Sequence, residues 1–293
     1  MIIKKTLGDR VFDAVNIAVL ILLSVCCLYP MLYVIFASLS DPAELSRAGG
    51  ILICPKGFQT ETYKVVFRNS DILTGYANTV FYVLTGTFIN ILLTVLGAYV
   101  LSRSGFKYRN ALMFYITFTM FVNGGLVPSY LLVKNIGILN TRWAILLPTA
   151  ISAYNLILTR TYFNTIPSTL EEAAKIDGAG HVTILFRIML PLAKPIIAVI
   201  GLYYAVAHWN SWFNAMIYLK DRKMWPLQLF LREILILNET GDMMANNAGL
   251  DTLPVAENIK YAIIVVATLP ILCVYPFLQK YFAKGVMIGA IKE

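Results

Sequence analysis

The sequence predicts an all-α integral membrane protein with six transmembrane helices. Of its 293 residues, 58% are hydrophobic and only 14% are charged. A water-soluble domain carries about a quarter charged residues, so this much apolar surface is typical of a protein in a bilayer. Lipid offers no hydrogen-bond partner to an open strand edge, and we therefore expect the spans to be helices.

Six apolar stretches are long enough to cross about 30 Å of hydrocarbon at about 1.5 Å per residue. They run approximately over residues 11–38, 75–102, 111–133, 143–163, 192–219 and 259–282. The first is too long for the core of a signal peptide and is followed by no small-residue cleavage site. We therefore expect it to stay attached.

The third stretch contains Gly124, Gly125 and Pro128. Gly lowers helix stability and Pro removes a backbone hydrogen bond, so we expect the helix to be interrupted here. Such a break could line a cavity or could be a structural kink.

The distribution of basic residues predicts the orientation in the membrane. Lys and Arg number 24 against 16 Asp and Glu, and most of the excess falls on the side that holds the N-terminus. The positive-inside rule then places both termini in the cytoplasm. The net charge of +8 thus indicates topology rather than nucleic-acid binding.

Two long connections, residues 39–74 and 220–258, are predicted on the outer side. In the second, the apolar positions of residues 225–232 recur at helical spacing, which predicts a short helix lying on the outer surface. We divide the chain into residues 1–74, which hold the N-terminal tail, the first transmembrane helix and an external loop, and a core of residues 75–293.

Nothing in the sequence indicates catalysis, a cofactor or a metal site. It contains no phosphate-binding loop, no dinucleotide-binding glycine pattern and no zinc-protease helix. Cys26, Cys27, Cys54 and Cys273 have no metal-ligand or disulfide spacing. Nearly all ionisable residues lie at or beyond the ends of the spans, which argues against an ion-coupled carrier. We therefore expect that this chain is not an enzyme and that a second protein supplies its energy.

The cytoplasmic connection between the fourth and fifth stretches is predicted to form a short helix. Ser168 can cap it, Glu171 can complete a capping box, and Gly178 and Gly180 can end it. A helix of about ten residues is marginal in isolation. It therefore needs a surface against which to dock.

The same segment has a recognisable spacing. Glu172-Ala173-Ala174 is followed after three residues by Gly178 and after nine more by Ile188-Met189-Leu190-Pro191. This pattern resembles the EAA loop of ABC-importer permeases. Further pieces resemble the carbohydrate-uptake, maltose-type branch of that family, in particular its complex-oligosaccharide subgroup: residues 78–81, 98–103, 123–130, 209–214, 226–228 and 279–290.

The resemblance implies a maltose-type permease core over residues 75–293, with a coupling helix at about residues 168–180. It implies a location in the bacterial cytoplasmic membrane. It also implies a second permease subunit, two ATPase subunits that bind ATP and magnesium, an external solute-binding protein and an oligosaccharide substrate. The expected residues of the coupling site are Glu171, Glu172, Ala173, Ala174, Asp177, Gly178 and Ala179.

The expected substrate pathway is Trp209, Asn210, Trp212 and Asn214. Aromatic rings can cover the C–H faces of sugars, and amides can both donate to and accept from hydroxyls. The two asparagines are four residues apart and are expected to share a helix face. Alternatively, the tryptophans mark a membrane interface and the asparagines join neighbouring spans. His208 is expected to be packed or hydrogen-bonded rather than to titrate.

The sequence therefore predicts a permease subunit of an ATP-driven sugar importer that works by alternating access. The same machinery could carry another polar solute, such as a polyol or glycerol phosphate. A cluster of cations in the pore would favour a phosphorylated solute, and the sequence shows none. An ion-coupled carrier or a channel is the third alternative.

Overall fold

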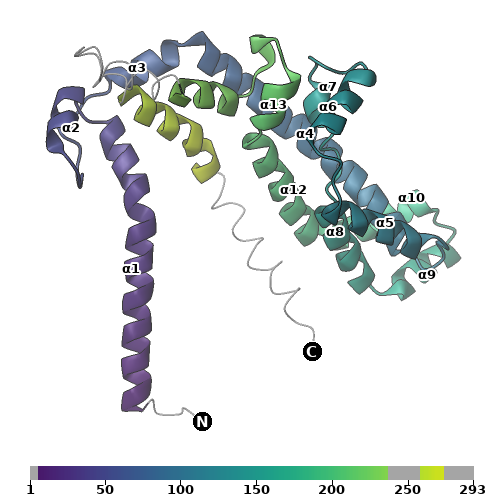
Figure 1. Cartoon of the computed structure of the whole chain (residues 1–293). Coiled ribbons are helices and arrows are strands. Elements are labelled where there is room, and N and C mark those ends of the chain that lie inside the picture. Colours follow the sequence, from purple (N-terminus) through teal and green to yellow (C-terminus); the bar gives the residue numbers. More distant parts are fainter. Residues whose placement is uncertain (1–5, 237–257, 274–293) are drawn as a thin grey trace. The chain divides into compact units, whose positions relative to one another are not determined.

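The computed structural model describes residues 6–236 and 258–273, and within these ranges every regular element is a helix. The chain divides into two compact units. The first comprises Met1–Asn69 and Glu233–Thr268, and the second comprises Ser70–Arg232 and Leu269–Glu293. Figure 1 shows the helices of both units. The all-helical prediction is confirmed for the described residues.

Two described helices, α1 (Leu7–Ser38) and α4 (Ser70–Ser102), are each long and apolar enough to cross a membrane. Two bent pairs could each form a broken span. One is α5 (Arg109–Phe121) with α6 (Leu126–Asn135), bent by 118°, and the other is His181–Leu192 with α12 (Lys194–Trp209), bent by 84°. The described residues thus contain up to four spans. The count of six and the location of the termini stay predictions.

In the first unit, α1 begins at a capping box in which Thr6 and Asp9 exchange hydrogen bonds. The helices α2 (Pro42–Ala48) and α3 (Glu61–Arg68) follow, and the helix Asn258–Cys273 starts in this unit. Asn258 donates from Nδ2 to the carbonyl of Ser40 at 2.5 Å. Residues 274–282 of the sixth predicted stretch lie outside the described residues.

The second unit is built around α4, which packs along α8 (Ala153–Thr165) and α12 (Figure 1). The side of α4 toward its neighbours buries polar residues, namely Asn78, Thr79, Asn90, Thr94 and Ser102. In a membrane, small and polar side chains at helix interfaces allow close approach and hydrogen bonds between helices. Gly86 and Gly97 of α4 serve the same close approach.

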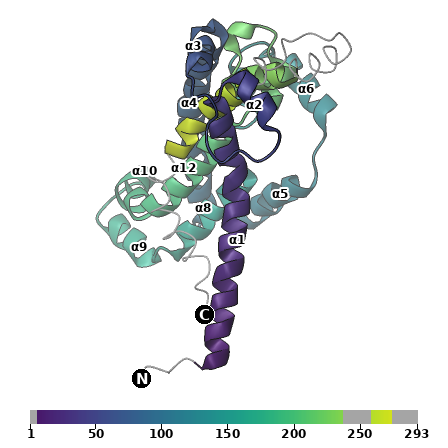
Figure 2. The same ribbon diagram turned by 90° about the vertical axis from the view of Figure 1, so that its left-hand side faces the viewer.

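The predicted break in the third stretch is confirmed. The helix α5 ends at Phe121 and α6 begins at Leu126 (Figure 2). Gly125 has φ 88°, a left-handed conformation that glycine adopts without steric cost. Its amide donates to Oδ1 of Asn123 at 2.9 Å.

The fourth predicted span, residues 143–163, is not one continuous helix. The short α7 (Trp143–Leu146) stops before Pro148, and α8 begins only at Ala153. Proline has no amide hydrogen and restricts the residue before it, which explains why the helix does not continue through this point. Ser152 then caps α8, since its Oγ accepts from the amide of Asn155 at 3.4 Å.

The fifth predicted span, residues 192–219, is also broken. The helix α11 (Leu190–Leu192) is separated from α12 at Ala193, and α12 ends at Trp209 before α13 (Phe213–Tyr218). The short helix predicted for residues 225–232 is present as residues 227–236. Leu227 and Phe230 of this helix are buried and lie close to Gly75 of α4.

The loop before that helix is tied to α4. Asn78 donates from Nδ2 to the carbonyls of residues 223 and 225 at 2.7 and 3.0 Å, and Tyr82 donates to the carbonyl of residue 224 at 2.8 Å. Thr79 Oγ1 accepts from the amide of Leu227 at 2.9 Å. Three residues of the sequence N-T-x-x-Y, within little more than one turn of α4, thus hold this loop by its backbone.

Candidate functional site: a coupling helix and a polar cavity

The coupling segment forms α9 (Ser168–Ile176), as the sequence predicts. The predicted capping box is wrong, because Pro167 stands at the N-cap and no side chain caps the helix. The Glu171 carboxylate is engaged instead by Arg103 and by Lys175. Proline has no amide hydrogen, so the N-cap offers the Glu171 carboxylate no backbone donor.

The end of α9 matches the prediction. Gly178 has φ +79°, its amide donates to the carbonyl of Lys175 at 3.0 Å, and the amide of Ala179 donates to the carbonyl of Ala174 at 2.9 Å. These two bonds form a Schellman motif, which needs a left-handed residue. Gly180 then starts α10 (His181–Ile184) as its N-cap.

The residues of α9 divide between two faces. Glu171 and Ala174, three positions apart, are buried, and Ala174 packs in the core that contains Ala98 and Phe163. Glu172, Ala173 and Asp177 are exposed. The predicted coupling residues therefore do not form one surface, because the helical repeat turns Glu171 and Ala174 toward their own subunit.

The coupling segment also exposes apolar side chains. Ile176 is 87% exposed and Val182 is 71% exposed. Leu170 is exposed as well. Leu170 and Ile176 belong to α9 and Val182 to α10, and an apolar side chain left exposed on a polar segment is a candidate contact residue.

Glu171 lies in a cluster of charges at the C-terminal end of α4. Arg103 donates from Nη1 to Oε2 of Glu171, and Nζ of Lys175 lies 2.9 Å from Oε1. Burial acts to raise the pKa of the Glu171 carboxyl, but the hydrogen bonds from Lys175 and Arg103 outweigh it and lower this pKa below its ordinary value. The carboxylate is therefore ionised at neutral pH.

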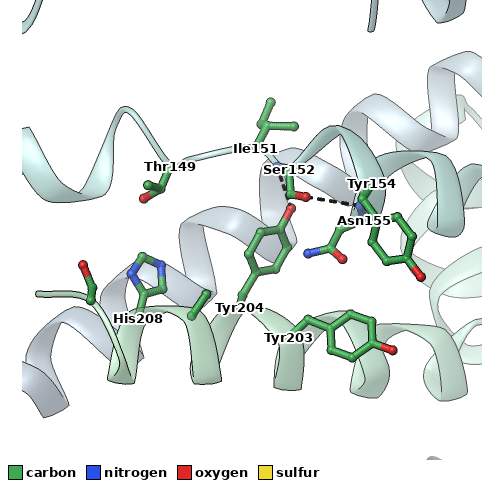
Figure 3. Close-up of a pocket in the computed structure, with 10 residues that line it drawn as sticks. Thr149, Ile151, Ser152, Tyr154, Asn155, Tyr203, Tyr204 and His208 are labelled. Carbon is green, nitrogen blue, oxygen red and sulfur yellow. Dashed lines mark hydrogen bonds between the residues drawn. The ribbon is translucent and has the colours of Figure 1, made fainter. Parts of the chain in front are cut away.

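A cavity of about 570 Å³ lies elsewhere in the second unit, between α12 and the segment that joins α7 to α8 (Figure 3). Ten residues line it: Thr149, Ile151, Ser152, Tyr154, Asn155, Tyr203, Tyr204, Ala207, His208 and Ser211. Eight of them carry a hydroxyl, amide or imidazole group, although most of the surface that the ten residues expose to the cavity is apolar. In Figure 3 the rings of Tyr204 and His208 rise from α12 toward residues 149–155.

Hydrogen bonds to α4 fix the polar wall of the cavity. The hydroxyl of Tyr204 lies 2.7 Å from Oγ1 of Thr94 and accepts from the amide of Ser152 at 3.0 Å. Nε2 of His208 lies 2.6 Å from Oδ1 of Asn90, whose Nδ2 donates to the carbonyl of Thr149 at 2.6 Å. The prediction that His208 is packed and hydrogen-bonded is confirmed.

The four predicted pathway residues lie between the end of α12 and the first turn of α13, and none of them lines the cavity. Trp209 is buried, and its ring centroid lies 6.3 Å from that of Tyr76. Trp212 is partly buried beneath the Arg232 guanidinium, 4.5 Å from its ring centroid. Asn210 is exposed and Asn214 is partly buried.

The expected shared helix face of Asn210 and Asn214 is wrong. Asn210 is the C-cap of α12, and residues 211 and 212 are not helical, so the two side chains do not follow one helical repeat. The residues beside them, His208 and Ser211, do reach the cavity.

Sequence reasoning missed residues 149–155 because it treated residues 143–163 as one span. Pro148 and Ser152 were the available signals, since a proline followed by a serine can end one helix and cap the next. In the part of the chain that the structure describes, no group of three His, Cys, Asp or Glu residues could hold a metal ion.

Comparisons with known proteins agree with this architecture. Residues 90–288 match the family described as "Binding-protein-dependent transport system inner membrane component". The chain is 43% identical to Protein LplC of Bacillus subtilis, over 98% of this chain and 97% of that protein. It is also 43% identical to the polygalacturonan/rhamnogalacturonan transport system permease protein YtcP of B. subtilis, over 97% and 99% of the two chains.

A solved structure is similar over almost the whole chain. It is a bacterial ABC transporter involved in the import of the acidic polysaccharide alginate. The TM-score is 0.87 at 35% identity, over 95% of this chain and 99% of that chain.

Proposed function

Because the chain belongs to the family of inner membrane components of binding-protein-dependent transport systems, we propose that it forms part of the sugar-conducting pathway of an ABC importer. It is a permease subunit in the bacterial cytoplasmic membrane, and ATP is hydrolysed by a separate subunit. Importers of this kind combine a partner permease, an ATPase and a solute-binding protein. Membership of this family argues against an ion-coupled carrier, because these transport systems are driven by ATP.

The outward face of α9 is the proposed docking surface for one of two ATPase subunits, which bind ATP and magnesium. Glu172 and Asp177 supply negative charge there, and Ile176 supplies an exposed apolar side chain. A charged rim around an apolar contact is a common interface composition. Gly178 shapes the turn and does not itself need to touch the partner.

The cavity is the proposed part of the sugar path, and its lining is the observation that carries this proposal. Among the ten described residues that line it, none is Lys, Arg, Asp or Glu. Hydroxyl and amide groups can bond sugar hydroxyls in either direction, and tyrosine rings can cover sugar C–H faces. This lining offers no cation to pair with a phosphate or with a uronate carboxylate, so we expect its bonds to go to the sugar hydroxyls of the cargo.

The names of the relatives support an oligosaccharide as the cargo. YtcP is named for polygalacturonan and rhamnogalacturonan, and the similar solved transporter imports alginate, an acidic polysaccharide. We propose that this importer carries oligosaccharides released from such polymers. The proposed cycle is alternating access, in which ATP binding closes the ATPases, α9 moves with them, and the pathway opens outward.

The test is uptake in proteoliposomes that contain the complete importer, with ATP inside and binding protein outside. Oligogalacturonides, neutral maltodextrins, a polyol and glycerol phosphate are offered in parallel. The proposal expects ATP-dependent uptake of at least one oligosaccharide, which a Ser211→Ala or Asn155→Ala change reduces. Uptake of glycerol phosphate or the polyol alone would contradict it.

A further inference from the structure

We propose that Arg103 is a positioning residue that fastens the coupling helix α9 to the end of α4 and passes the movement of α9 on to the cavity. This inference rests on the proposed docking of an ATPase on α9. It gives Glu171 an internal role, distinct from that of its exposed neighbour Glu172.

Arg103 is held on three sides. Its guanidinium donates to Glu171 from Nη1, and to Oγ of Ser102 from Nε at 3.1 Å and from Nη2 at 2.9 Å. The guanidinium carbon lies 5.0 Å from the ring centroid of Tyr99. The side chains of Arg103 and Glu171 are 15% and 11% exposed. A planar, stacked guanidinium with this many fixed donors cannot be replaced by lysine without losing contacts.

The position of Arg103 suits this role because it directly follows the last residue of α4. The C-terminus of a helix carries partial negative charge, so a cation is favourable there. Nε of Arg160, on α8, donates to the carbonyl of Leu101 at 2.9 Å. Two arginines thus join the ends of three helices, α4, α8 and α9.

A second contact reinforces the connection. The hydroxyl of Tyr99 lies 3.2 Å from Nδ1 of His181, at the start of α10. Arg103 packs on the same tyrosine ring. The coupling segment is therefore bound to α4 both before and after its glycine turn.

The helix α4 connects this cluster with the cavity. Asn90 and Thr94, about three and two turns before its C-terminal end, hold His208 and Tyr204 of the cavity wall. A displacement of α9 that moves Arg103 would therefore move the helix that positions both rings. Contiguity of this kind makes coupling possible, and only a coupling measurement demonstrates it.

The experiment is a double-mutant cycle in the complete importer with Arg103→Gln, Glu171→Gln and the two combined. Three quantities are measured: ATPase copurified with the permease, ATP hydrolysis, and sugar transported per ATP. Each single variant should keep its ATPase subunits and lower the transport-to-ATP ratio by about fivefold or more, the lower end of typical coupling factors. The double variant should lose no more than either single one.

Arg187→Gln is the matched control, because Arg187 is an exposed arginine on the π-helical turn Leu185–Met189. An unchanged transport-to-ATP ratio in both single variants would overturn the inference. If the losses of the transport-to-ATP ratio add up in the double variant, the two residues act separately, which would also overturn the inference. If the losses only follow reduced expression, the roles are purely structural, with the same consequence. A different result would contradict the docking proposal: the ATPase would copurify normally with the Glu172→Lys variant.

Discussion

Gly86 of α4 lies directly against the imidazole of His208 on α12. A Cβ built on Gly86 would lie 2.4 Å from Nε2 of His208 and 2.6 Å from its Cε1. The same nitrogen lies 2.6 Å from Oδ1 of Asn90. The hydrogen bond that fixes one wall of the cavity therefore depends on the absence of a side chain one turn earlier on α4.

We expect Gly86→Ala to push His208 away from Asn90. A rigid ring cannot yield as a flexible chain end can, and overpacking of this kind costs about 1 to 3 kcal/mol. The melting temperature of the importer in detergent and its sugar uptake should both fall. Gly97→Ala is the control, since its nearest neighbour is the terminal Cδ1 of Leu156 at 3.0 Å, which can rotate away. Equal effects of the two changes would contradict the explanation.

Glu172→Lys should weaken association with the ATPase and leave membrane insertion intact. Glu172 is exposed on α9, and replacing a charged hydrogen bond worth about 1.5 kcal/mol or more by repulsion should weaken binding roughly tenfold. Copurification of the ATPase and sugar-stimulated ATP hydrolysis measure the effect. Glu61→Lys, an exposed charge reversal on α3, is the control. Normal stimulated hydrolysis with Glu172→Lys would exclude this role.

The coupling segment could be predicted in detail because its signals are local. Gly178 ends α9 through its own left-handed backbone, and three-residue spacing decides which side chains share a face. Glu171 is predicted among the coupling residues, but its burial against Arg103 could not be foreseen, because that arginine is 68 positions away in the sequence. No periodicity within α9 carries information about that arginine.

The cavity could not be predicted for a similar reason. Apolar composition identified residues 143–163 and 192–219 as spans, but composition does not specify whether a span is continuous. The break after Leu146 brings Ser152 to Tyr204, a hydrogen bond across 52 positions. Asn210 and Asn214 were predicted to share a face by the same assumption of continuity, which the end of α12 contradicts.

Asn210→Ala and Asn214→Ala should now have smaller effects on uptake than changes in the cavity, because neither residue lines it. Uptake of two oligosaccharides and the melting temperature in detergent should be measured for both. Little change in either measurement is expected for the exposed Asn210. If instead a variant loses uptake of one sugar while its melting temperature is unchanged, the asparagine does contact the sugar in the pathway.

The stabilising effect of the Arg103–Glu171 pair should not vary between about pH 6 and pH 8. The pKa of Glu171 is lower in the folded protein than its ordinary value of 4.5, so the pair contributes fully above that value. The contribution is lost as the pH falls through the lower, folded-state pKa. This contribution is measured as the difference in melting temperature between the wild type and Glu171→Gln, from about pH 8 down to about pH 4. A difference that shrinks already between pH 8 and pH 6 would contradict this assignment.

Asn155 offers the sharpest test of the cavity and of the charge of its cargo. Its side chain is buried in the cavity wall on α8, and Asn164 on the same helix is exposed and does not line the cavity. If Asn155 bonds a sugar hydroxyl, alanine leaves that group unpaired at a cost of about 1 to 3 kcal/mol, or roughly a 5- to 150-fold loss of uptake. Asn164→Ala should have no comparable effect.

Asn155→Asp adds a negative charge with almost no change in shape. Like charges repel strongly where water is partly excluded, so an acidic oligosaccharide should be transported less well by this variant than by Asn155→Ala. A neutral oligosaccharide should be affected less by the charge. The measurement is uptake of oligogalacturonide and of maltodextrin of matched length by each of the three variants. Copurified ATPase is the control for assembly of the importer. Equal uptake by Asn155→Ala, Asn155→Asp and Asn164→Ala would remove Asn155 from the sugar path.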